Sequence, residues 1–173
     1  TPTLILSDVK DVELGSENVI ALKNDGSVWM MGTTLQGIMG WDDKDAHLVN
    51  EMTKVMDGCK DIAVGEAFAM AVKNDGTLYG WGSNAFTALG IDDDVSCTST
   101  PVVVATGVKS VDAGDRNAYF IKNDGSLWSV GDGGHGQRGI GNDIGYEDPD
   151  GGVPYAYPSY PTQVATDVHS VSG

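Results

Sequence analysis

Basic residues are scarce in this sequence: 10 Lys and Arg stand against 25 Asp and Glu, and the formal net charge is −15. A nucleic-acid-binding surface needs Lys and Arg to displace the counterions of the phosphates. No local run of basic residues supplies such a surface, so the sequence argues against nucleic acid and against anionic membrane surfaces as partners. The same acidity favours solubility and attracts a partner with a basic patch.

Cysteines and long apolar runs are also few. The only cysteines, Cys59 and Cys97, form no Cys-x-x-Cys pair and no metal-ligand spacing. We expect both to be free thiols, with Cys59 filling a small core position and Cys97 lying in a loop. Cysteine usage therefore does not indicate a compartment. No 18 consecutive residues are apolar, so we expect no membrane insertion.

Glycine, by contrast, is abundant, with 24 residues that recur at fixed places. The tetrapeptide Lys-Asn-Asp-Gly occupies residues 23–26, 73–76 and 122–125, so its copies are 50 and 49 residues apart. Such a constant register identifies a repeat protein, and a period near 50 is typical of propeller blades. The glycines that keep this register around each copy are Gly15, Gly65 and Gly114, Gly32, Gly82 and Gly131, and Gly40, Gly90 and Gly139.

Each repeat has the pattern of four short strands. Residues 9–15, 59–65 and 108–114 alternate apolar and polar side chains, as a half-buried strand does. An apolar run then leads into Asn-Asp-Gly, where glycine accepts a positive φ, and this predicts a tight hairpin. A fourth strand follows a longer loop, and no segment shows a helical period with caps. We expect an all-β fold in which four-stranded sheets stack as the blades of a β-propeller.

The repeats predict a single partial propeller over residues 1–173, with repeats near 12–61, 62–110 and 111–170. Residues 4–6 resemble a fourth strand and residues 168–173 a first strand, so we expect three blades plus one extra strand pair. Three blades do not close a ring, because propellers usually have about four to eight. We therefore expect part of a longer propeller, or self-association through open blade edges. The predicted core comprises Val12, Leu14, Ala21, Leu22, Val28, Ile62, Val64, Ala71, Val72, Leu78, Val111, Ala113, Ile121 and Leu127.

The second repeat carries a family resemblance. Residues 72–84, followed by Leu89-Gly90, resemble the repeat of the regulator of chromosome condensation family. The first and third repeats keep most of the same glycines. The resemblance implies a seven-bladed propeller of four-stranded blades but no single activity. Members include a nucleotide-exchange factor, a light sensor, a β-lactamase inhibitor and numerous bacterial modules.

Departures from the family pattern argue against some of these activities for this chain. Asn18, Phe68 and Asn117 stand where the family often has His, which removes a structural side chain but no catalytic one. The net charge argues against chromatin binding. Four Trp and two Arg are too few for the cluster of the plant photoreceptor members. The Lys-Asn-Asp-Gly turn most resembles bacterial members, so we expect an extracellular or cell-surface protein, while a cytoplasmic location stays open.

Function is expected on one end of the blades. Loops that join the first to the second strand, and the third to the fourth, vary between repeats and emerge together, and variable loops on a rigid scaffold are common binding sites. The loop at 132–160 is longest and interleaves Tyr with Pro. This loop is either a partner-binding loop or an ordinary insertion. Trp41 and Phe86 are either exposed anchors for a partner or side chains that hold their own loops in place. The predicted partner-binding residues are Glu17, Trp41, Glu66, Phe68, Phe86, Asp115, Tyr155, Tyr157 and Tyr160.

Catalytic and metal-binding patterns are weak. His47, His135 and His169 fall at unrelated repeat positions, and no nucleophile elbow or recurring carboxylate pair is present. The acidic stretches at 42–45, 92–94 and 147–150 lack the spacing of a calcium-binding EF-hand loop and read as solvated loops, although bound Ca²⁺ stays an open alternative. We expect no enzyme activity, no metal and no cofactor. The predicted function is a non-catalytic protein-binding module. The alternative is an exchange-factor-like regulator of a small GTPase.

Overall fold

The computed structural model describes residues 1–41, 47–92, 94–133, 136–140 and 160–171. Strands dominate it, and its only helical elements within these residues are two short 3₁₀ turns. The elements in chain order are β1 (Val9–Leu14), β2 (Asn18–Lys23), β3 (Val28–Thr33), η1 (Leu35–Gly37), β4 (Leu48–Met56), β5 (Cys59–Val64), β6 (Phe68–Lys73), β7 (Leu78–Ser83), η2 (Ala85–Thr87), β8 (Cys97–Ala105), β9 (Val108–Ala113), β10 (Asn117–Lys122), β11 (Leu127–Gly131) and β12 (Thr162–Ala165).

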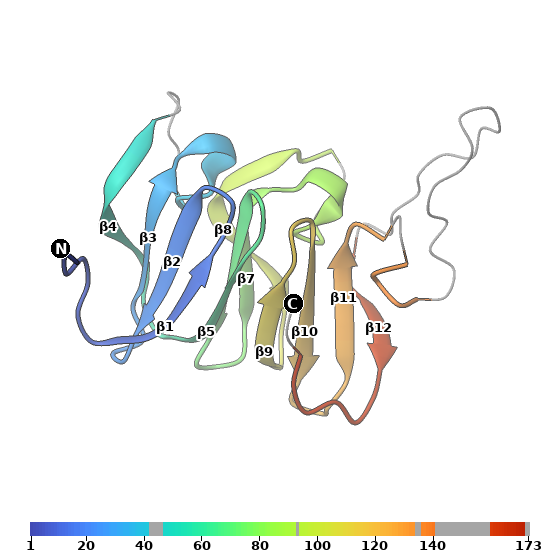
Figure 1. Ribbon diagram of the computed structural model, residues 1–173. Coiled ribbons are helices and arrows are strands. Elements are labelled where there is room, and N and C mark those ends of the chain that lie inside the picture. The colour runs from blue at the N-terminus through green and yellow to red at the C-terminus, as the bar shows by residue number, and fades with distance from the viewer. Residues whose placement is uncertain (42–46, 93, 134–135, 141–159, 172–173) are drawn as a thin grey trace.

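The described strands form three four-stranded antiparallel sheets. Each sheet contains consecutive strands in chain order: β1 to β4, β5 to β8, and β9 to β12. We call these sheets blade 1, blade 2 and blade 3, and Figure 1 shows them stacked side by side. The all-β fold with four-stranded blades is confirmed. Cys97 opens β8 as an exposed residue, whereas Cys59 is buried as expected.

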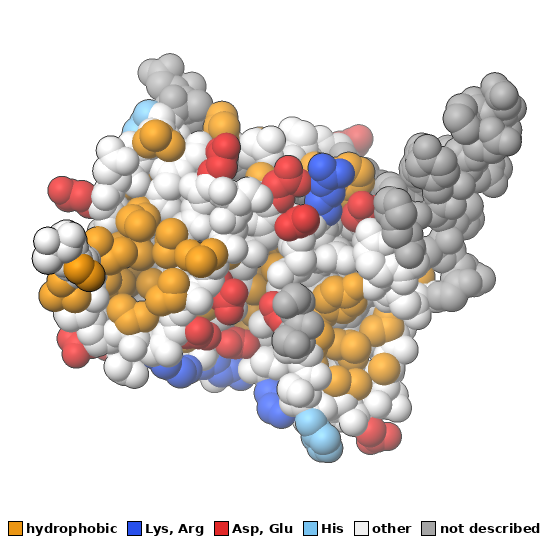
Figure 2. Space-filling model, viewed as in Figure 1, with side chains coloured by type: hydrophobic (Ala, Val, Ile, Leu, Met, Phe, Trp, Pro, Cys, Tyr) orange, Lys and Arg blue, Asp and Glu red, His pale blue; other side chains and the backbone are white. Residues whose placement is uncertain are grey.

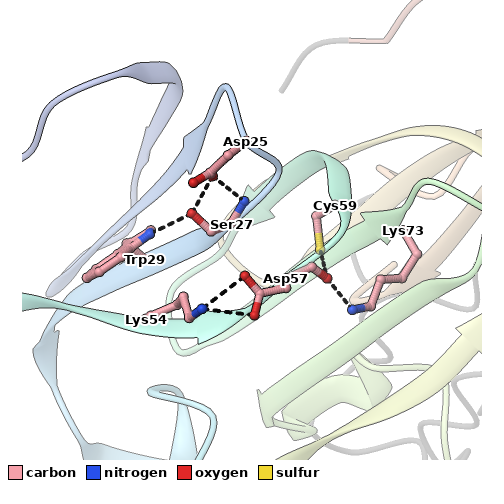
Figure 3. Close-up of polar contacts among 7 residues, drawn as sticks. All are labelled: Asp25, Ser27, Trp29, Lys54, Asp57, Cys59 and Lys73. Carbon is pink, nitrogen blue, oxygen red and sulfur yellow. Dashed lines mark hydrogen bonds and ion pairs between the residues drawn. The ribbon is translucent and has the colours of Figure 1, made fainter.

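The Asn-Asp-Gly turns are held by a short chain of hydrogen bonds. Asp25 accepts bonds from the Ser27 backbone N–H at 2.9 Å and from the Ser27 hydroxyl at 2.6 Å. The same hydroxyl accepts a 2.8 Å bond from the Trp29 indole N–H (Figure 3). Both Ser27 bonds hold the pKa of Asp25 below its usual value of 3.8. Asp124, Ser126 and Trp128 repeat the arrangement in blade 3.

Neighbouring blades are joined at these turns. The Cys59 N–H, the first of β5, donates to the carbonyl of Gly26 at 2.9 Å. Val108 N–H donates likewise to the carbonyl of Gly76 at 2.8 Å. A lysine adds a second link, since the Lys60 ammonium donates to the Val108 carbonyl at 2.9 Å. The first strands of blades 2 and 3 are therefore each hydrogen-bonded to the Asn-Asp-Gly turn of the preceding blade.

The core consists of two layers, one between each pair of blades. Ile20, Leu22 and Met30 of blade 1 pack against Ile62 and Trp81 of blade 2. The opposite face of blade 2 packs against blade 3 through Phe68, Met70, Leu78, Val111 and Phe120. No single blade has a core of its own, which is the arrangement expected of stacked repeats.

Four predicted core residues are not fully buried. Val12 is 48% exposed and Leu14 is 74% exposed, because both lie on the face of blade 1 that no other described blade covers. Their counterparts Ile62 and Val64 are buried by blade 1. Ala113 and Leu127 are partly buried.

Two segments with strand patterns carry no strand. Residues 4–6 and 168–171 are both outside the sheets. A strand forms only when a neighbouring strand takes up its backbone hydrogen bonds, and residues 4–6 have no such neighbour among the described residues. The Val168 N–H donates to the Gly125 carbonyl at 2.9 Å. This segment therefore has the position of a first strand without the pairing.

Candidate functional site

The variable loops emerge at the same end of all three blades, as expected from the strand order (Figure 1). We call this end, with the β1–β2, β5–β6 and β9–β10 loops and both 3₁₀ turns, the loop face. The opposite end, with the Asn-Asp-Gly turns, is the turn face. Six lysines lie near the turn face, because each stands at the end of a second strand or the start of a first strand. They are Lys10, Lys23, Lys60, Lys73, Lys109 and Lys122.

An arginine, a glutamate and a phenylalanine meet on the loop face. The Arg116 Nε donates to the Glu66 carboxylate at 2.9 Å, and its guanidinium carbon lies 4.9 Å from the centre of the Phe86 ring. The hydrogen bond that Arg116 donates to Glu66, together with the negative charge of Glu66, raises the pKa of Arg116, with smaller contributions from Asp132 and Asp115. Guanidinium groups stack favourably on aromatic faces, so these side chains form one unit across blades 2 and 3.

A shallow hollow of about 510 Å³ opens beside this unit. Three carboxylates, those of Glu66, Asp115 and Asp132, face one guanidinium around it, so the hollow favours a cationic group. The backbone stiffens its rim, because Glu66 N–H donates to the Asp115 carbonyl at 2.8 Å. Figure 2 shows acidic side chains gathered over this end of the molecule. The residues that line the hollow are Ser16, Glu66, Asp115, Arg116, Asn117, Asp132 and Gln137.

The Phe86 ring is presented by a backbone held in an unusual conformation. Phe86 and Thr87 have φ values of 58° and 59°, in the left-handed region that non-glycine residues seldom adopt. The Asn84 side chain braces the turn: its amide donates to the Val95 carbonyl at 2.9 Å and its oxygen accepts from the Leu89 N–H at 3.1 Å. Phe86 stays 38% exposed. Strained backbone of this kind is concentrated at functional sites.

The strain at Thr87 gives a stability prediction. The corresponding residue of blade 1 is Gly37, which has a φ of 75°. Thr87→Gly should raise the free energy of unfolding by about 0.5 kcal/mol, because removal of the left-handed strain exceeds the added flexibility of the unfolded chain. Thr34, at a φ of −94°, is the control, and Thr34→Gly should destabilise. Urea unfolding measures both, and a loss of stability in Thr87→Gly would contradict the assignment of strain.

Four of the predicted site residues line one small hollow beside Arg116: Glu66, Phe68, Phe86 and Asp115. Glu66, Asp115 and Phe86 surround Arg116, which the sequence analysis did not select. Glu17 is exposed but lines a separate hollow on blade 1. A cross-blade pair such as Arg116 and Glu66 has a separation of 50 residues, which is the repeat period, and this was the signal that could have found it.

Phe68 lines that small hollow with a buried side chain, and the other predicted residues that the structure describes lie away from it. Phe68 is 2% exposed and packs between blades 2 and 3, so it belongs to the core and not to a partner-binding surface. Its side chain is on the same face of β6 as Met70 and Val72, which pack against blade 3. Trp41 is partly buried against the core between blades 1 and 2. Tyr160 is 67% exposed. Tyr155 and Tyr157 lie outside the described residues.

Other chemistry on the described surface is limited. Among the residues that the structure describes, no three His, Cys, Asp or Glu side chains are placed to hold a metal ion. Residues 42–45 and 147–150, two of the acidic stretches, lie outside the described part, as does His135. No described helix has the length and apolarity to span a membrane.

Sequence comparison places the repeats in a known family. Models described as "Regulator of chromosome condensation (RCC1) repeat" match residues 59–87 and 108–137, and, in a second model, 75–121. Residues 59–137 of this chain therefore match RCC1 repeats. The matched segments span most of blades 2 and 3. A comparison with curated protein sequences found no match.

Solved structures agree on the RCC1-type propeller fold. Yeast RCC1 (Prp20) bound to Kap60 is 24% identical with a TM-score of 0.78, over 99% of this chain and 41% of that chain. A second structure of the same protein, Prp20p from Saccharomyces cerevisiae, is 23% identical with a TM-score of 0.76, over 99% of this chain and 42% of that chain. Human WBSCR16 is 19% identical with a TM-score of 0.67, over 90% and 37%. The chain therefore spans about two fifths of these RCC1-type chains.

Proposed function

We propose that this chain is a non-catalytic protein-binding module that holds a partner with a basic patch on its loop face. The observation that carries the proposal is the unit of Glu66, Arg116 and Phe86 beside a hollow with three carboxylates. A rigid, partly exposed aromatic ring and a charged rim are the usual components of a protein interface. One solved relative, yeast Prp20, binds Gsp1p and histones and is bound to Kap60 in a second structure, which supports a binding role for this fold.

The distribution of charge favours the loop face over the turn face. Glu66, Asp115 and Asp132 surround a single arginine on the loop face, whereas the turn face has lysines among its aspartates. An approaching basic surface is therefore attracted to the loops. Such steering raises the association rate and weakens with added salt, because exposed charges are screened beyond about 8 Å at physiological ionic strength.

Affinity capture with the immobilised chain tests the proposal. Once a partner is captured, Glu66→Gln with Asp115→Asn should weaken its binding about tenfold and flatten the dependence of the association rate on salt. Both substitutions keep the size of the side chains. The control neutralises two exposed aspartates of the turn face, Asp8→Asn with Asp167→Asn, and should change binding less than twofold. A larger loss in the control than in the loop-face variant would place the binding surface at the other end.

An exchange-factor-like regulator of a small GTPase is the second candidate. It is favoured by the binding of Prp20p, a protein of similar fold, to Gsp1p. The discriminating measurement is nucleotide release from any captured GTPase in the presence of the full chain. Accelerated nucleotide release would show that the chain acts as an exchange-factor-like regulator, and the proposal of a passive binding module would then be wrong. Release at the basal rate would leave the binding module in place.

A further inference from the structure

The loop face already binds one guanidinium group, that of Arg116, between a carboxylate and an aromatic ring. The Arg116 Nε lies 2.9 Å from the Glu66 carboxylate, and its guanidinium carbon lies 4.9 Å from the centre of the Phe86 ring. A carboxylate and an aromatic face are the two kinds of group by which proteins usually recognise arginine. We call Glu66 and Phe86 together the guanidinium subsite.

The Arg116 side chain is held weakly in this subsite. Its exposed fraction is 50%, and that of the Glu66 side chain is 48%. Exposed ion pairs contribute little to stability, because water screens the charges and both side chains lose rotamer freedom. Among the described residues, Arg116 donates one hydrogen bond, through Nε, and so lacks the two parallel bonds of a bidentate arginine–carboxylate contact. Another guanidinium group can therefore take its place with little loss of free energy.

Two further carboxylates stand ready to pair with Arg116 if it leaves Phe86. Asp115 and Asp132 line the adjoining hollow together with Arg116. After Glu66, their charges also raise the pKa of Arg116, so both act on its guanidinium group. The hollow holds three carboxylates and one guanidinium, a formal charge of −2, and it therefore attracts a second cation while Arg116 is still present.

The subsite and its occupant are not part of the contacts that stack the blades. Those contacts recur at equivalent positions between blades 1 and 2 and between blades 2 and 3. The combination of glutamate, arginine and phenylalanine is found only at the second of these two junctions. At the first, the same three repeat positions hold Ser16, Ala67 and Gln36. Stacking of the blades therefore does not require this combination.

We propose that the guanidinium subsite binds an arginine side chain of the protein partner, and that Arg116 is the internal occupant that this arginine displaces. The proposal rests on the loop-face function proposed above and names the side chain by which the partner is recognised. Arginine is favoured over lysine, because a planar guanidinium stacks on Phe86 while it donates to Glu66, whereas a lysine ammonium is a point charge. Arg116 thereby competes with the partner and lowers its affinity.

Removal of the internal occupant tests the proposal. Arg116→Gln should bind the peptide acetyl-Gly-Arg-Gly-amide about fivefold more tightly than the natural chain, the upper range for one exposed ion pair. The gain for acetyl-Gly-Lys-Gly-amide should be about twofold, from charge alone. Saturable shifts of the Phe86 ring NMR signals measure both affinities. Lys54→Gln is the matched control, because it removes the cation of another exposed ion pair, with Asp57, and should leave both affinities unchanged.

The two peptides separate this inference from the proposed function. A larger gain for the arginine peptide than for the lysine peptide supports the guanidinium subsite. Equal gains would overturn it, because charge alone would then account for binding. Weaker or unchanged binding by Arg116→Gln would also overturn it, since Arg116 would then not compete with the ligand. The protein-binding function fails on a different result, namely unchanged capture of the partner by Glu66→Gln with Asp115→Asn.

Discussion

Gly82→Ala is expected to lower the free energy of unfolding by roughly 3 kcal/mol or more, through left-handed strain and steric overlap together. Gly82 has a φ of +99°, and a Cβ atom on it would come within 2.5 Å of the Ala67 carbonyl oxygen and 2.8 Å of the Phe68 Cα. These are backbone atoms, which cannot rotate away as a side chain does. The β5–β6 loop would have to move away from β7. Because this loop carries Glu66, the rim of the candidate site would move with it.

Gly107→Ala measures how much of this loss in unfolding free energy comes from left-handed strain without steric overlap. Gly107 also has a positive φ, +70°, but a Cβ atom there would meet nothing within 4 Å. It should therefore cost only the conformational strain, about 1 kcal/mol. Urea unfolding followed by circular dichroism measures both variants. Similar losses at the two positions would show that the close approach at Gly82 is relieved by a small backbone movement.

Trp81→Ala should lower the free energy of unfolding by about 4 kcal/mol, the typical cost of deleting a buried aromatic side chain. Trp81 is completely buried between blades 1 and 2, and its indole donates to the Ile38 carbonyl. The substitution would remove packing from both blades and the polar contact that holds η1 in place. Because the blades lack separate cores, the loss should appear in the single unfolding transition of the chain.

Trp81→Phe isolates the hydrogen bond. It keeps most of the ring but leaves the buried Ile38 carbonyl without its indole donor, at a cost of about 1–3 kcal/mol. Trp29→Phe is the matched control, because the Trp29 indole donates to the Ser27 hydroxyl at a partly buried position. Trp29→Phe should cost less than Trp81→Phe in the same denaturation assay. The reverse order would mean that the turn network is the stronger of the two contacts.

The repeat register allowed the blades to be predicted, because turn glycines and alternating strands are local signals. Burial at Val12 and Leu14 could not be predicted in this way, since it depends on whether a neighbouring blade covers the strand. Phe68 was misplaced for a related reason: it sits at a loop boundary in the sequence, but its ring faces blade 3. The stacking of Arg116 on Phe86 joins residues of different blades, and no local pattern in either segment predicts it.

The backbone hydrogen bonds that join the blades at the turn face run from a donor in the later blade to an acceptor in the earlier blade. The carbonyl of Gly26 belongs to a hairpin that closes within blade 1, and only afterwards does it accept the first N–H of β5. Gly76 and Val108 repeat the relation one blade later. A chain that emerges from the ribosome at about 5–20 residues per second therefore completes each acceptor before its donor is made. The blades are therefore suited to fold in order of synthesis, because each finished hairpin presents the carbonyl to which the first strand of the next blade binds.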